Sequence, residues 1–240
     1  MGPNTLLHDD RLFPSGTAER AIARRLYASV RNLPIISPHG HTDPRWFADN
    51  TPFPDPAALL VIPDHYVFRM LYSQGVPLES LGVPRGDGGE VESDPRKIWR
   101  LFARHFHLFR GTPTQLWFLH VFQEVFGITE RLTPQSADRV YDRIAECLAG
   151  PEFLPRALYE RFNIEVLATT DSPLDPLAHH RKLRQSGWPG RVIPTFRPDP
   201  VVDPDFPDFA RNVQRLGDIT REDTATWPGY LRALADRRRY

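Results

Sequence analysis

The stretch Leu33-Pro-Ile-Ile-Ser-Pro-His-Gly-His-Thr-Asp-Pro44 joins a short apolar run to two histidines that are two residues apart. An apolar pair such as Ile35-Ile36, followed by polar residues, is typical of a buried parallel strand that opens into a loop at its carboxyl end. Side chains alternate along an extended chain, so His39 and His41 on such a strand point the same way. They are positioned to bind one metal ion together, at the end of the strand where α/β barrels carry their catalytic ligands.

Two further apolar, β-branched segments, residues 164–169 and 191–196, predict strands, and helix signals alternate with them. Polar side chains stand directly after each segment: Thr170 and Asp171 after the first, Arg197 and Asp199 after the second. Parallel strands present their carboxyl ends at one edge of a sheet. We therefore expect these side chains and the two histidines on one rim, where α/β folds bind ligands.

Helix signals follow one another without an intervening strand between residues 64 and 150. N-capping residues precede a proline at three places: Ser93 or Asp94 before Pro95, Thr112 before Pro113, and Thr133 before Pro134. Asp64 caps a further helix and places His65 and Tyr66 in its first turn. A histidine there is ordinarily a surface residue, but this pair could also project into a cleft. A run of helices is unusual for repeating βα units, so we expect a helical insertion at about residues 64–150.

The composition excludes several classes of protein. Thirty lysine and arginine residues balance thirty aspartate and glutamate residues, so no net field attracts nucleic acid or an anionic membrane. No apolar run approaches the roughly 20 residues that span a bilayer. Cys147 is the single cysteine, which excludes an internal disulfide framework. Because the start of the chain has no secretory leader pattern, we expect a globular, cytoplasmic protein of one large domain or two small ones.

Five motifs occur in order along the chain and together resemble one family. They are His39-Gly-His41, Asp64-His-Tyr66 with Arg69, Phe126-Gly-Ile128, Thr169-Thr-Asp-Ser-Pro-Leu-Asp175 with His179-His180, and Val192-Ile-Pro-Thr-Phe-Arg-Pro-Asp199. In this combination the chain resembles uronate isomerase, the glucuronate isomerase of sugar-acid catabolism, within the amidohydrolase superfamily. The resemblance extends from about residue 6 to the end. Pro38 and Gly40 differ from many relatives, and neither difference removes a ligand.

The resemblance implies an α/β fold of a particular kind, a partial (β/α)8 TIM barrel of amidohydrolase type with the helical insertion at about residues 64–150. Relatives are about twice as long, so we expect residues 1–240 to be the N-terminal part of that barrel, with its C-terminal half absent. In relatives the later strands supply an aspartate that completes the metal site, and a tryptophan and a second arginine that bind substrate. A barrel needs all of its strands to close. The chain alone is therefore expected to be almost inactive, as a fragment or as one part of a split protein.

The implied reaction is aldose–ketose isomerisation of D-glucuronate to D-fructuronate and of D-galacturonate to D-tagaturonate. It needs a base for the C2 proton, a route for that proton to C1, and stabilisation of the enediol oxygens. The resemblance assigns a divalent metal to His39 and His41, with zinc as the first choice and manganese or iron also suited to such ligands. Arg197 would bind the substrate carboxylate through its planar fork. His65 and Tyr66 would contact the sugar hydroxyls and assist proton movement.

Some assignments stay open at the level of sequence. Asp171 is a second candidate for substrate binding, although it could instead cap the helix near Asp175 or brace the rim. His179 and His180 are expected inside that helix, away from the rim, in a structural role. Self-association into a homo-oligomer also stays open, beside the small-molecule hexuronate as the expected partner.

Two other functions also fit part of the pattern. A different amidohydrolase, acting on an amide or a lactone, would use His-x-His and a metal as well. That enzyme would have no special need for Arg197 together with His65 and Tyr66. A non-catalytic binding or assembly module is the second alternative, and it would have no need of a metal.

Overall fold

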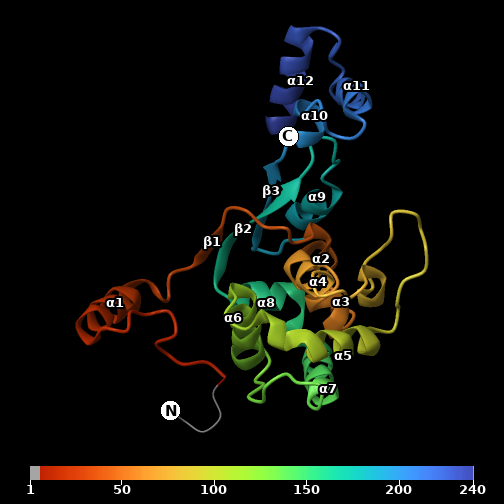
Figure 1. Ribbon diagram of the computed structural model, residues 1–240. Helices are drawn as coiled ribbons and strands as arrows, with labels where there is room; N and C mark the ends of the chain where they lie inside the picture. The colour runs from red at the N-terminus through yellow and green to blue at the C-terminus, as the bar shows by residue number, and fades with distance from the viewer. Residues whose placement is uncertain (1–5, 240) are drawn as a thin grey trace. The chain divides into compact units, whose positions relative to one another are not determined.

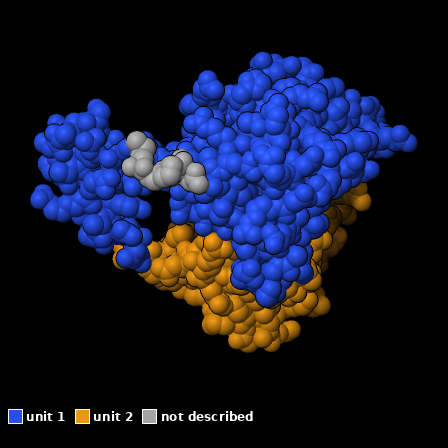
Figure 2. Space-filling model, turned by 90° about the horizontal axis from the view of Figure 1, so that it is seen from below, with its two compact units in different colours: residues 1–32, 52–154 blue, residues 33–51, 155–240 orange. Residues whose placement is uncertain are grey.

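The structure of the chain is a computed structural model that describes residues 6–239. It divides into two compact units, which Figure 2 distinguishes by colour. Residues 1–32 and 52–154 make up the first unit, and residues 33–51 and 155–240 make up the second. The chain therefore enters the second unit at residue 33, returns to the first at residue 52, and re-enters the second at residue 155.

The second unit contains a parallel sheet of three strands (Figure 1). Its strands are β1 (Ile35–Ser37), β2 (Ile164–Asp171) and β3 (Arg191–Phe196), with β2 in the middle. Helix α9 (Ala178–Gln185) makes the crossover from β2 to β3. The two later strands and the alternation of helix and strand are therefore confirmed, and β2 extends two residues further than its apolar run. An α/β fold follows from this sheet.

Strand β1 is shorter and more exposed than the sequence predicts. It ends at Ser37, so His39 and His41 lie in the loop beyond it and the expected alternation along a strand is wrong. Ile35 and Ile36 expose 49% and 63% of their surface, which contradicts a buried strand. The packing of the second unit explains this, because its buried cluster draws side chains from short helices, β2 and β3, and none of the described cluster residues comes from β1. The buried side chains of the sheet come from β2 and β3 instead.

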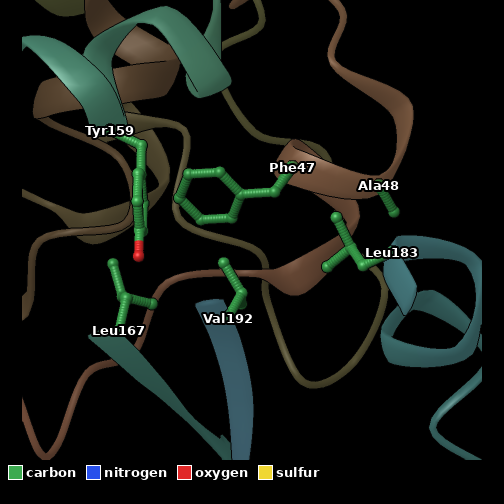
Figure 3. Close-up of a cluster of buried hydrophobic side chains, with 6 residues drawn as sticks. All are labelled: Phe47, Ala48, Tyr159, Leu167, Leu183 and Val192. Carbon is green, nitrogen blue, oxygen red and sulfur yellow. The ribbon is translucent and has the colours of Figure 1, made fainter. Parts of the chain in front are cut away.

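The core of the second unit packs three short helices against β2 and β3. The helices are α2 (Pro44–Asp49), α8 (Pro155–Arg161) and α9. Figure 3 shows the cluster that they form with the sheet: Phe47, Ala48, Tyr159, Leu167, Leu183 and Val192. The Phe47 ring stacks on Trp188 with centroids 6.0 Å apart, and its edge meets Tyr159. This packing anchors α2, the helix that directly follows the two histidines, to the sheet.

Three further helices of the second unit follow β3: α10 (Asp199–Val202), α11 (Phe209–Thr220) and α12 (Trp227–Arg239). They bury a small core of Val201, Leu216 and Ala233. Arg237 of α12 donates to the backbone oxygens of Pro173 and Asp175, each at 2.7 Å. The loop that follows β2 is therefore tied to the last helix.

The described part of the first unit is helical and contains no strand. Its α-helices are α1 (Thr17–Val30), α3 (Pro56–Leu60), α4 (His65–Tyr72), α5 (Pro95–His105), α6 (Pro113–His120) and α7 (Ala137–Leu148). Shorter helical turns are η1 (Leu78–Leu81), η2 (Phe106–Phe109), η3 (Val121–Val125) and η4 (Pro151–Phe153). Its largest fully buried side chains are aromatic: Trp99, Phe102, Phe109, Phe118 and Phe122.

The helix starts in this unit match the capping signals, with one exception. Asp94 accepts hydrogen bonds from the backbone nitrogens of residues 96 and 97, and Thr112 accepts one from that of Gln115. The prediction that Thr133 caps a helix is wrong, because α7 begins at Ala137. Residues 133–136 form a turn instead, in which the Ser136 hydroxyl donates to the Arg131 carbonyl. No helix among residues 6–239 is both long and apolar enough to cross a membrane.

Candidate functional site

A cavity of about 500 Å³ lies at the carboxyl ends of the three strands. Its lining consists of His41, Thr42, Asp43, Pro44, Thr170, Ser172, Arg197, Asp199, Pro200 and Phe206. Polar residues that follow each of the three strands are therefore brought together, as the sequence predicts. All of these residues belong to the second unit.

The two histidines converge even though they lie beyond the strand. Their Nε2 atoms are 3.1 Å apart, and their rings meet edge to face with centroids 4.9 Å apart. The loop between them is fixed at Gly40, whose carbonyl accepts a hydrogen bond of 2.8 Å from the Thr170 hydroxyl. A methyl group at Gly40 would lie 3.1 Å from the Ala168 carbonyl oxygen, which is tighter than ordinary contact. Close approach to β2 therefore favours glycine between the two histidines.

The spacing of the pair suits two ligands of one metal ion. Two imidazole nitrogens bound to a tetrahedral zinc ion at about 2.0–2.1 Å lie about 3.3 Å apart. The observed 3.1 Å between the Nε2 atoms of His39 and His41 is close to that value. Both rings are exposed, so an ion can reach them. Across residues 6–239 no group of three or more histidine, cysteine, aspartate or glutamate side chains is placed to hold an ion. Among the described residues, the pair is therefore the most that this loop brings together.

Arg197 follows β3 and reaches the same cavity. Its backbone nitrogen donates to the Asp171 carbonyl at 3.0 Å, which continues the β2–β3 ladder by one bond. Its Nε atom donates to Asp199 at 3.2 Å, and the side chain is 52% exposed. A guanidinium has five N–H donors, so the bond to Asp199 leaves the capacity for a bidentate contact with a carboxylate.

Asp171 faces away from this cavity. Thr170 and Ser172 line the cavity, and Asp171 between them is not among the described lining residues. Its carboxylate accepts a hydrogen bond of 2.6 Å from the Thr169 hydroxyl on the same side of β2. Helix α9 starts at Ala178 without a side-chain cap, so Asp171 does not cap it. Of the alternatives left open, the geometry favours a residue that braces the rim.

His180 lies nearer the rim than the sequence suggests. Its Nε2 atom is 2.9 Å from the Thr169 hydroxyl, and the side chain is buried between α9 and β2. Burial lowers the pKa of His180 below its ordinary value, and the nearby Asp171 carboxylate partly opposes that shift. His180 lies inside the helix as expected, although α9 begins at Ala178 and not near Asp175, so His180 stands in its first turn.

His65 and Tyr66 lie in the first turn of α4, in the first unit. The predicted N-cap is confirmed, since Asp64 accepts hydrogen bonds from the backbone nitrogens of Tyr66 and Val67 at 2.8 and 3.3 Å. The two rings lie against each other with centroids 4.3 Å apart. Both side chains are exposed, with 65% of the Tyr66 surface accessible. They are therefore open to a ligand, and their catalytic role stays a prediction.

Comparison with known proteins decides the family. The family described as glucuronate isomerase matches residues 11–240. The chain belongs to the glucuronate isomerase family. It is 60% identical over 235 residues to the uronate isomerase of Rhizobium meliloti strain 1021, and 62% identical over 232 residues to that of Rhizorhabdus wittichii. These matches cover 98% and 97% of this chain but 50% and 48% of the relatives. The chain thus spans about half the length of the curated relatives it matches.

Solved structures of the glucuronate isomerase family share the fold. The crystal structure of glucuronate isomerase from Caulobacter crescentus is 53% identical with a TM-score of 0.93. Uronate isomerase from Thermotoga maritima is 29% identical with a TM-score of 0.83. Each comparison covers 97% of this chain and 48% of the other chain. The family resemblance predicted from the five motifs is confirmed.

Proposed function

We propose that the chain carries the metal-binding and carboxylate-binding part of a uronate isomerase. The reaction is that of EC 5.3.1.12, from D-glucuronate to D-fructuronate and from D-galacturonate to D-tagaturonate. The observation that supports it most is the cavity beyond the parallel strands that His41 and Arg197 line, with the Nε2 atom of His39 3.1 Å from that of His41, in a chain of this family. We also propose that the sheet is part of a (β/α)8 barrel of amidohydrolase type, with residues 64–150 as its helical insertion and with cytoplasm as the compartment.

In this proposal Arg197 binds the uronate carboxylate. The planar fork of its guanidinium matches the two carboxylate oxygens, and Asp199 holds the guanidinium at Nε. Ser172 lines the same cavity and offers a hydroxyl to the sugar, while the Thr170 hydroxyl, whose proton goes to the Gly40 carbonyl, can still accept a hydrogen bond. The carboxylate thereby orients the other end of the sugar, which carries C1 and C2, for reaction.

The metal is the second element of the proposal. His39 and His41 would hold a divalent ion, zinc first, with manganese or iron as alternatives. When bound, the ion would supply a Lewis acid that orients and polarises substrate oxygens. His65 and Tyr66 are assigned to the proton transfer between C2 and C1, because imidazole and phenol groups both donate and accept protons. Asp171, which the sequence assigned to substrate binding, would act by bracing the rim.

We further propose that the 240-residue chain alone turns substrate over weakly or not at all. Within residues 6–239 two imidazoles converge without a third ligand, so an ion bound there is held by a partial set. Substrate binding is less demanding, because Arg197 and the cavity lining are already present.

Calorimetry on the purified chain tests the proposal. D-Glucuronate is titrated into the chain with and without zinc, and a coupled assay measures isomerisation. Binding should depend on zinc and be lost in His41→Ala and Arg197→Lys, whereas His107→Ala, an exposed histidine of the first unit, should bind normally. Binding that is equal in all variants would refute the site. Turnover at a rate usual for enzymes, about 10 s⁻¹, would refute the expected inactivity.

The two alternative functions give different results in the same experiments. Hydrolysis of lactones or amides by the zinc-loaded chain, without affinity for D-glucuronate, would favour a hydrolase. A folded chain that binds neither zinc nor D-glucuronate would favour a non-catalytic module.

A further inference from the structure

Two buried polar side chains of the second unit have no part in the proposed function. Thr169 and His180 expose 1% and 3% of their surface, and they lie where α9 meets the carboxyl end of β2. Burying polar groups costs free energy unless they are hydrogen-bonded. An apolar pair could close the same contact, as Leu167 and Leu183 do in the adjoining core. The polar pair therefore calls for a reason that packing alone does not give.

The hydrogen bonds of these groups run in one direction. The Thr169 hydroxyl lies 2.6 Å from Asp171 Oδ2 and 2.9 Å from His180 Nε2. A hydroxyl has one proton and a carboxylate only accepts, so the hydroxyl donates to Asp171 and accepts from His180. The Ile193 carbonyl, at 3.2 Å, is a more distant acceptor for the same proton. His180 must then carry a proton on Nε2, and burial lowers the pKa of its ring below the ordinary value.

These hydrogen bonds end at Asp171, the last residue of strand β2, next to the residues that line the candidate site. Asp171, whose side chain is 9% exposed, accepts a hydrogen bond from the Thr169 hydroxyl at its carboxylate and one from the Arg197 backbone N–H at its carbonyl. Thr170 precedes Asp171 and bonds to the loop of the two histidines. Asp171 thus connects the buried Thr169 hydroxyl to the backbone that carries Arg197.

We propose that Thr169 and His180 are positioning residues that hold Asp171, and through its carbonyl the Arg197 backbone, in the orientation that binds a uronate carboxylate. The relay runs from His180 Nε2–H to the Thr169 hydroxyl and from that hydroxyl to Asp171. Linked hydrogen bonds in a dry interior strengthen one another, so loss of the central hydroxyl releases both ends. This inference rests on the proposed function of Arg197, but the relay itself can be measured without substrate.

The first test is nuclear magnetic resonance of the full chain labelled with ¹⁵N and ¹³C. His180 should show the Nε2–H tautomer. Thr169→Val, which keeps the shape and removes the hydroxyl, should shift the Asp171 carboxyl carbon and the Arg197 backbone amide. Thr169→Ser, which keeps the hydroxyl, should leave both resonances near their original positions. The Nδ1–H tautomer, or an Arg197 amide unaffected by Thr169→Val, would overturn the proposal.

The second test is the affinity of the zinc-loaded chain for D-glucuronate. Thr169→Val should bind about tenfold more weakly, the effect of losing a hydrogen bond to a charged group, and Thr169→Ser should restore binding. His180→Leu should lower the affinity as much as Thr169→Val does, whereas His180→Gln should retain much of it through its amide N–H. His179→Leu is the matched control on the same helix. In an Asp171→Asn background the Thr169→Val effect should shrink, because coupled residues are not additive.

The outcomes separate this inference from the proposed function. Equal affinity of Thr169→Val and the parent chain, or full additivity with Asp171→Asn, would refute the positioning role. If the parent chain binds no D-glucuronate, the proposed function fails, and the His180 tautomer and the Arg197 amide still decide the relay. Denaturation in urea identifies any variant that has lost the fold. If Thr169→Val or His180→Leu does not fold, Thr169→Ser and His180→Gln, which keep a hydrogen-bonding group, still test the relay.

Discussion

The hydroxyl of Thr170 is expected to hold the two histidines in place for a metal ion. It donates a hydrogen bond of 2.8 Å to the carbonyl of Gly40, which lies between His39 and His41. Thr170→Val keeps the shape of the side chain and removes this donor. A net loss of about 1 kcal/mol is usual for one neutral hydrogen bond, and it corresponds to about fivefold weaker binding if the bond is needed for the histidines to converge.

Calorimetric titration of zinc into the purified chain measures this effect. Thr170→Val should bind zinc about fivefold more weakly than the parent chain, in proportion to the lost hydrogen bond. Thr170→Ser should bind like the parent, because the serine hydroxyl can donate to the same carbonyl. Thr195→Val on the neighbouring strand is the control for loss of a threonine hydroxyl elsewhere. Equal zinc affinity in Thr170→Val and the parent, with the fold intact, would refute the reasoning.

Three further predictions concern the loop, the core and the pH dependence. Gly40→Ala should weaken zinc binding, because the added methyl group would lie 3.1 Å from the Ala168 carbonyl oxygen and push the loop away from β2. The zinc titration described above measures this effect, and unchanged affinity would show that the loop adapts. Phe47→Ala should lower the free energy of unfolding in urea by about 3–5 kcal/mol, because a nearly buried ring stacked on Trp188 is lost, while Phe47→Leu should cost less. Burial lowers the pKa of His180 below the ordinary histidine value of 6.5. Just below pH 6.5 the unfolded chain therefore binds more protons than the folded chain. Stability should fall as the pH drops through that value towards the folded pKa. Urea denaturation at a series of pH values should show a smaller loss of stability with falling pH for His180→Gln, and identical curves would contradict the role of His180. The charged or titratable groups facing His180 are Asp171, Asp175, His179 and Arg184.

Local signals predicted the elements that local chemistry specifies. The capping residues Asp64, Asp94 and Thr112 begin helices as expected, because their side chains accept hydrogen bonds from residues next to them in sequence. The apolar segments of β2 and β3 are also strands, and their register brings Thr170 and Arg197 to one rim. These features depend on neighbours in sequence or on the general geometry of parallel sheets.

Other features of the site depend on contacts between distant residues, which one sequence does not reveal. The two histidines converge through a loop, and not through alternation on a strand. That loop is held at Gly40 by a hydrogen bond from Thr170, which lies 130 residues away in sequence. β2 continues to Asp171, and this extension turns the Asp171 side chain towards α9 and away from the cavity. His180 of α9 lies against Thr169 of β2, a contact between residues of different elements with no local sequence signal.

The central claim is that the histidine pair and Arg197 form one site for a metal ion and a uronate carboxylate. A crystal structure of the chain with zinc and D-glucuronate tests it most directly. We predict that the zinc ion lies between the Nε2 atoms of His39 and His41 and that the carboxylate is bound by the guanidinium of Arg197 in the same cavity. A zinc ion bound at other residues, or a carboxylate that makes no contact with Arg197, would contradict it.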